Sequence, residues 1–193
     1  MSSSVSAQGR DHDGFMLRLT GGFGYGALTS ETRLGELRLD GAAVDFAVDV
    51  GGAIVENLNV HGRFAFASVV GPSVSVDGER LGTDEEASTS MMLLGPGLTY
   101  YIMPANVYLT AFGGIAFASI SYENRLNERE TGTSDVGIGL GFDLGWEFWI
   151  GRSWAIGPAL RFMYISVPNG GDGPDETTSQ GLAVGALFSA TMQ

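Results

Sequence analysis

Two carboxylates, Asp143 and Glu147, lie four residues apart in the stretch VGIGLGFDLGWEFWI, residues 136–150. Two carboxylates held close together in different environments can act as general acid and general base. The same stretch alternates strictly, because every even position from Val136 to Ile150 is large and apolar and most odd positions are glycine or acid. A period of two indicates a strand with one apolar face. The chemistry open to the two acids therefore depends on which side of a sheet they occupy.

The rest of the chain offers little material for catalysis. Nucleophilic catalysis needs a nucleophile, a base and an orienting group within reach of one another, and the only histidines are His12 and His61. His12 lies in an Asp-His-Asp stretch that could bind a metal but is more typical of a solvated terminus. Residues 169–176 offer oxygen ligands for calcium, yet they lack the spacing of a calcium loop and also fit turn chemistry. We expect no enzyme activity, no metal and no cofactor.

Length and composition indicate one domain. The chain has 193 residues, 30 glycines, no cysteine and a net charge of −12. The acidic balance argues against nucleic-acid binding, and no stretch approaches the roughly 20 apolar residues of a membrane-spanning helix. Residues 1–12 are predicted to be a flexible segment, either a signal-peptide remnant, given the Val-Ser-Ala at 5–7, or an added tail. Residues 13–193 are predicted to form the domain.

Alternation with a period of two recurs along the chain and predicts an all-β fold. Long and short connections alternate between the runs, so antiparallel strands would place every long connection at one end. An even number of such strands closes into an up-and-down barrel without an exposed edge. The eight runs are about 14–26, 37–50, 58–70, 90–102, 107–122, 136–150, 154–166 and 180–192.

Two runs depart from the simple pattern. Leu37 and Leu39 have the opposite parity to the apolar residues further along the run 37–50, and a β-bulge near Gly41 would produce such a change. The run 107–122 is apolar on both parities, so its faces stay unassigned.

One face of the runs is bulky and apolar, and the other is small with a few charges. A soluble ligand-binding barrel would turn the apolar face inward. An eight-stranded interior is only just wide enough to be filled by side chains or to hold one small ligand, and could not take large residues from every strand. The opposite arrangement, apolar outside and small or charged inside, is the transmembrane β-barrel pattern. We therefore predict an eight-stranded antiparallel up-and-down transmembrane β-barrel, with the soluble barrel as the alternative.

Parity places a set of charged residues inside the barrel. Buried charges are costly unless they are paired, so we expect interleaved ion pairs that fill the lumen. The acids of the second strand would lie between arginines of the first and third, and the inner glycines would make room for the arginine side chains. A lined pathway for ions or a small polar solute is the alternative. The predicted lumen residues are Arg18, Asp45, Asp49, His61, Arg63, Asp143, Glu147 and Arg161.

Tyrosines and tryptophans gather near the predicted strand ends. Their rings suit the boundary between membrane and water, because an apolar body carries a polar tip. The predicted aromatic girdle is Tyr25, Tyr100, Tyr101, Tyr108, Tyr122, Trp146, Trp149, Trp154 and Tyr164.

With these features the sequence resembles the small eight-stranded bacterial outer-membrane β-barrels, such as the transmembrane domain of outer membrane protein A and the X-type outer membrane proteins. The resemblance spans about 13–192 and rests on DGFMLRLTGGFGYG, LGPGLTYYIMPANVYL and GIGLGFDLGWEFW. It implies a place in the bacterial outer membrane, a salt-bridged lumen without a continuous pore, and long loops that face outside. The chain departs from the pattern at its end, FSATMQ, which lacks the terminal aromatic that resembles an assembly signal.

Most of the negative charge falls in the long connections. The segments 27–36, 71–89, 123–135 and 167–179 carry net charges of −1, −4, −2 and −3. An acidic exposed end could attract cations or cationic proteins. We expect a monomer embedded in a lipid bilayer, with a structural or surface-interaction role. A narrow channel or a carrier for small solutes is the second hypothesis.

Overall fold

A computed structural model describes residues 14–32, 35–83, 87–123, 129–169 and 177–193. The predicted flexible segment 1–12, with His12, and all but the first residue of the calcium candidate lie outside these ranges. The strands, in chain order, are β1 (Phe15–Thr32), β2 (Gly35–Val55), β3 (Leu58–Val70), β4 (Ser73–Val76), β5 (Glu79–Thr83), β6 (Ser88–Ile102), β7 (Val107–Glu123), β8 (Arg129–Thr133), β9 (Gly137–Trp146), β10 (Phe148–Ile150), β11 (Trp154–Asn169) and β12 (Thr177–Met192).

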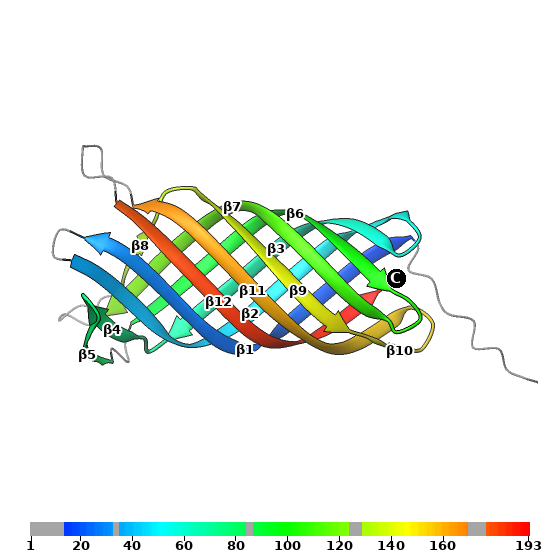
Figure 1. Ribbon diagram of the computed structural model, residues 1–193, viewed down its shortest axis with the longest axis horizontal. Helices are drawn as coiled ribbons and strands as arrows, with labels where there is room; N and C mark the ends of the chain where they lie inside the picture. Colours follow the sequence, from blue (N-terminus) through cyan, green and yellow to red (C-terminus); the bar gives the residue numbers. More distant parts are fainter. Residues whose placement is uncertain (1–13, 33–34, 84–86, 124–128, 170–176) are drawn as a thin grey trace, which may run out of the picture.

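Eight antiparallel strands form the wall of a closed barrel (Figure 1). Strand β1 pairs with β12 on one side and with β2 on the other, which closes the sheet. The wall then runs through β3, β6, β7, β9 and β11 back to β12. The short strand β10 follows β9 in the chain and, like β9, pairs with β11. The predicted fold class is confirmed.

The two ends of the barrel differ as the connection lengths require. At the short-turn end, Asn57, Asn106 and Gly151 have φ of 64°, 53° and 82°, the left-handed region that tight turns use and that Asn and Gly tolerate best. At the other end, strands extend the sheet where the sequence suggested polar loops. The β4–β5 hairpin pairs with β2, and β8 pairs with β7. We call this the long-connection end.

The outer face of the barrel is apolar along its length. Phe23 is 74% exposed, Ile138 73% and Phe142 55%. Monomeric soluble proteins rarely expose a contiguous apolar surface of more than a few hundred Å², whereas a membrane-spanning barrel presents such a band to lipid. Among the described residues, no helix is long and apolar enough to cross a membrane.

The predicted bulge in β2 is absent. Pairing between β1 and β2 runs without a break from Phe15 opposite Gly52 to Thr32 opposite Gly35. Leu39 is 7% exposed, so its side chain points into the barrel, as do the acidic side chains further along β2. The parity prediction was wrong because it assumed a lumen lined by small and polar residues throughout. The lumen is instead apolar toward the long-connection end, so a leucine can point inward there.

Candidate functional site: the charge chain of the lumen

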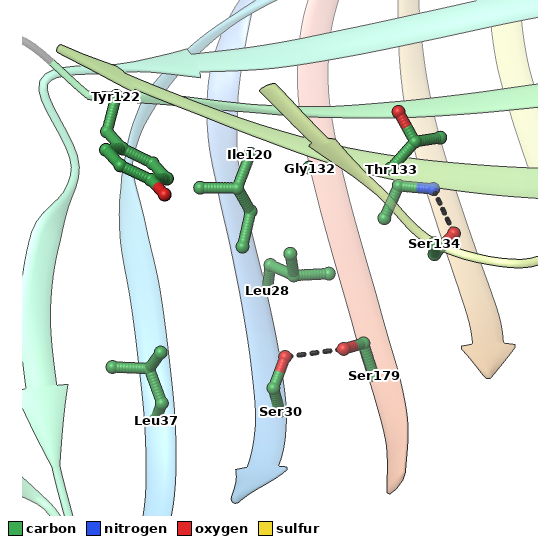
Figure 2. A pocket seen from close by; sticks show the side chains of 10 residues that line it. Leu28, Ser30, Leu37, Ile120, Tyr122, Gly132, Thr133, Ser134 and Ser179 are labelled. Atoms are coloured by element: carbon green, nitrogen blue, oxygen red, sulfur yellow. Dashed lines mark hydrogen bonds between the residues drawn. The ribbon is translucent and has the colours of Figure 1, made fainter. Parts of the chain in front are cut away.

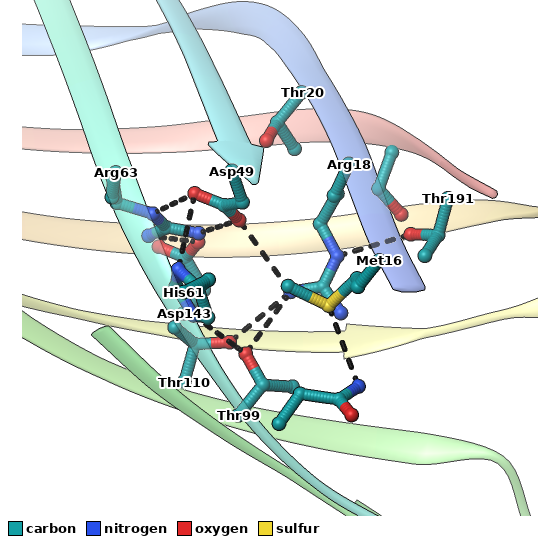
Figure 3. A network of polar contacts seen from close by, with 12 residues as sticks. Met16, Arg18, Thr20, Asp49, His61, Arg63, Thr99, Thr110, Asp143 and Thr191 are labelled. Carbon is teal, nitrogen blue, oxygen red and sulfur yellow. Dashed lines mark hydrogen bonds and ion pairs between the residues drawn. The ribbon is translucent and has the colours of Figure 1, made fainter. Parts of the chain in front are cut away.

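Seven charged side chains cross the lumen in a sequence of alternating sign. Each side chain is at most 3% exposed. Each one forms an ion pair with the next in this spatial order, with a nitrogen-to-oxygen distance of at most 3.8 Å. Every arginine thus stands between two carboxylates, and the total charge of the seven is −1. In order, this charge chain is Glu147, Arg18, Asp49, Arg63, Asp143, Arg161 and Asp45 (Figure 3 shows its central part).

Arg63 and Arg161 make the most regular contacts. Arg63 holds Asp49 with two hydrogen bonds, of 2.5 Å from Nε and 2.6 Å from Nη2, and reaches Asp143 with Nη1 at 2.6 Å. Arg161 donates to both oxygens of Asp143, at 2.9 and 3.1 Å, and reaches Asp45 at 2.6 Å. Two parallel N–H donors on one carboxylate form the strongest and most directional kind of ion pair. Asp143 therefore accepts hydrogen bonds from two guanidinium groups.

Arg18 occupies the part of the lumen nearer the short-turn end. Its Nη2 donates to the Tyr101 hydroxyl at 2.5 Å, and its guanidinium carbon lies 3.9 Å from the centre of the Tyr108 ring. Arg18 Nε lies 3.5 Å from Glu147 Oε1. Threonines from three other strands accept the remaining donors, at 3.0 to 3.4 Å, and they are Thr99, Thr110 and Thr191.

His61 lies beside the charge chain and is 3% exposed. Its Nε2 lies 3.0 Å from the Thr99 hydroxyl, while Nδ1 is 3.7 Å from Asp49 and has no hydrogen-bond partner among the described residues. Gly97 on the neighbouring strand makes space for the ring, because a Cβ there would lie 2.2 Å from it.

The glycines of β9 serve a different purpose from the one expected. A Cβ on Gly141 would lie 2.3 Å from the Phe112 ring, and one on Gly145 would lie 2.2 Å from the Tyr108 ring. These glycines seat aromatic rings from β7, not arginine side chains. The arginines stack over the same rings, since Arg63 lies 4.2 Å from the centre of Phe112. The glycines therefore position the charge chain indirectly, through the rings.

An apolar layer fills the lumen between the charge chain and the long-connection end. Its large members are at most 5% exposed and pack with small alanines from several strands. Sequence parity missed this layer because its large members come from only four strands, with one each on β1 and β7, two on β6 and three on β11. The large members are Leu28, Met91, Leu93, Phe112, Met163, Ile165 and Val167.

The structure divides the predicted aromatic girdle. Tyr25, Tyr100, Trp146 and Trp154 are exposed on the outer face, and Tyr164 is partly exposed there.

The other four aromatic residues lie on the inner face, so the girdle prediction was wrong for them. Tyr101 and Tyr108 are buried beside Arg18, and Tyr122 lines a cavity at the long-connection end. Trp149 is half-buried and pairs with Ala155, whose side chain is buried in the lumen. Proximity to a strand end, which suggested the girdle, does not distinguish the two faces of a strand.

The geometry separates the two carboxylates that first suggested acid–base chemistry. Asp143 accepts hydrogen bonds from Arg63 and Arg161, whereas Glu147 lies beside Arg18 and accepts from Thr191 and Tyr101. Each is thus committed to cationic or hydroxyl donors within the barrel. Among the described residues, no group of three or more His, Asp or Glu side chains is arranged to hold a metal ion.

Comparison with known proteins supports the fold. No protein-family model and no curated protein sequence matches the chain. The solved outer membrane protein OprG from Pseudomonas aeruginosa superposes with a TM-score of 0.55 at 13% identity, covering 94% of this chain and 98% of that one. Neisserial surface protein A superposes with a TM-score of 0.45 at 11% identity, covering 92% of this chain and 96% of that one. Ail of Yersinia pestis, in complex with the heparin analogue sucrose octasulfate, superposes with a TM-score of 0.43 at 11% identity, covering 91% of this chain and 98% of that one.

The closed sheet, the apolar outer face and the match to OprG define the class of protein. The chain has the fold of the transmembrane β-barrels of the bacterial outer membrane. Within that class it is similar to the small eight-stranded barrels.

Proposed function

We propose that this chain is a monomeric, non-enzymatic outer-membrane barrel with a closed lumen, and that it acts through its long-connection end as a structural or surface-interaction protein. The observation that carries the proposal is the alternating charge chain. Its three arginines are at most 1% exposed, and each contacts two carboxylates from different parts of the barrel wall. An ion that crossed the barrel would have to displace these contacts.

The apolar layer supports the same proposal. An ion that passed the charge chain would next meet buried side chains such as Met91, Leu93 and Ile165, each 0% exposed. Transfer of an ion into such surroundings without a partner costs far more than thermal energy. Two barriers of opposite character therefore lie in series in the lumen.

Conductance across a planar lipid bilayer tests the closed lumen. We expect no single-channel steps from the folded protein near neutral pH, with a general porin in the same bilayer as the positive control. Steady, sizeable steps would favour the second hypothesis, a narrow channel or carrier for small solutes.

The surface role is supported by charge, because the four long segments hold most of the net charge of −12. We expect the protein in lipid nanodiscs to bind oligo-lysine, a simple cationic probe, with an affinity that falls as salt is added. A variant with Asp84, Glu85 and Glu86 changed to Asn, Gln and Gln should bind more weakly. Equal binding by both proteins would argue against recognition through the acidic segments.

A further inference from the structure

The long-connection end of the lumen contains a cavity of about 390 Å³. We call it the mouth cavity. Side chains from β1, β2, β7 and β12 face one another across it (Figure 2). Its volume lies in the range of small-molecule sites, about 300–1,000 Å³.

The floor of the mouth cavity is sealed. Leu28, which is 2% exposed, belongs both to the cavity wall and to the apolar layer beneath it. Ile120 also lines the cavity and packs against that layer. The apolar layer and the charge chain both lie below this floor. The cavity is therefore a blind site and not the entrance to a passage.

The lining combines an apolar body with a few hydroxyl groups. Leu28, Leu37, Ile120 and the ring of Tyr122 provide the apolar surface, and the Tyr122 side chain points into the cavity (Figure 2). On the facing wall, the hydroxyls of Ser30 and Ser179 lie 2.5 Å apart and form a hydrogen bond across β1 and β12. Among the residues that the structure describes, none that lines the cavity is charged, although the segments at this end of the barrel are strongly acidic.

From this lining we infer that the mouth cavity binds a small uncharged molecule with an apolar body and one hydroxyl group. The leucine, isoleucine and tyrosine surfaces take the apolar body, and the Ser30–Ser179 pair receives the hydroxyl. A hydroxyl can both donate and accept, so it can join the serine pair without leaving either serine unpaired. A charged ligand would lose its hydration and find no opposite charge on the described walls of the cavity. This site is independent of the closed lumen and of the acidic surface.

Benzyl alcohol is a suitable probe, because it has this chemistry and dissolves in water. We expect saturable chemical-shift changes at the amides of Ser30, Ile120 and Ser179 when benzyl alcohol is added to the ¹⁵N-labelled protein in nanodiscs. Ile120→Trp should fill the cavity and abolish the changes. Ser119→Trp is the matched control, because the neighbouring side chain lies on the opposite face of β7 and should leave binding intact.

A second variant identifies the polar contact and does not depend on how the cavity tolerates a large ring. The double change Ser30→Ala and Ser179→Ala should weaken benzyl alcohol binding about fivefold, as expected for loss of one hydrogen bond. Toluene, which lacks the hydroxyl, should bind this variant as well as it binds the original protein. Shifts that grow without saturation, that centre on lipid-facing residues, or that persist in Ile120→Trp would overturn the inference.

Discussion

Arg63 on β3 and Asp143 on β9 form an ion pair across the lumen, with Nη1 of the arginine 2.6 Å from Oδ2 of the carboxylate. Two strands, β6 and β7, separate them around the wall. The pair therefore connects two strands that are not neighbours in the barrel wall. Since Asp143 also binds Arg161 on the adjacent strand, one carboxylate couples three strands. Loss of a single member of the charge chain should therefore destabilise the whole barrel wall.

Replacement of Arg161 with Met should destabilise the barrel strongly. Arg161 is the ion-pair partner that the described residues provide for Asp45, so the variant leaves a buried carboxylate unpaired. Breaking a buried pair in this way typically costs about 3–5 kcal/mol. The measurement is the urea unfolding midpoint in phospholipid vesicles, followed by tryptophan fluorescence.

Arg38→Met provides the matched control for this change. Arg38 pairs with Asp40 at 3.2 Å, but its side chain is 45% exposed. An exposed pair contributes about 0–1 kcal/mol, so the unfolding midpoint should barely move. Equal midpoints for Arg161→Met and the original protein would show that the buried pair is absent or hydrated.

Removal of the Tyr101 hydroxyl should also destabilise the protein. The Tyr101 oxygen accepts a hydrogen bond from Arg18 and donates one to Glu147 at 3.3 Å, so Tyr101→Phe leaves buried charged groups with fewer partners. We expect a loss of about 1–3 kcal/mol in the free energy of unfolding. Tyr100→Phe makes the same change on the neighbouring residue, which is 52% exposed on the outer face. A larger effect at Tyr100 than at Tyr101 would contradict the assignment of the two rings to opposite faces.

A methyl group added to Gly141 should disturb the seat of the Phe112 ring. The new Cβ would lie 2.3 Å from that ring and 2.6 Å from the carbonyl oxygen of Phe162, and overpacking of this kind costs about 1–3 kcal/mol. Gly62→Ala is the control, because the nearest atom to a Cβ there is 3.9 Å away. The control should change stability by less than about 1 kcal/mol and can even stabilise the protein. Comparable losses for both variants would mean that glycine is needed for the backbone and not for the ring.

The sequence was sufficient to predict the barrel because its wall follows a local rule. Alternation places Phe142 outside and Asp143 inside without knowledge of any other strand. The pairing of Arg161 with Asp143 was predictable in the same way, because adjacent strands bring the two into register.

Contacts across the lumen could not be predicted from neighbouring strands. Asp45 binds Arg161 on β11 rather than an arginine on an adjacent strand, because a long guanidinium side chain reaches across a narrow bore. Tyr101 and Tyr108 show the complementary limit. A tyrosine near a strand end fits the membrane boundary and the lumen equally well, so the residue type alone assigns no face, and in the structure both rings contact Arg18 in the lumen.

Introduced cysteines can test the continuous pairing of β2 with β1 around Gly41, because the chain has no cysteine of its own. The Arg38 side chain is 45% exposed and Leu39 is 7% exposed, so Arg38→Cys should react rapidly with a membrane-impermeant maleimide. A cysteine at position 39 must wait for local opening of the barrel and should react at least about tenfold more slowly. Both variants should react equally fast after unfolding in urea, which controls for the chemistry of the thiols. A bulge near Gly41 would turn position 39 outward and position 38 inward, and would reverse the order of the two rates.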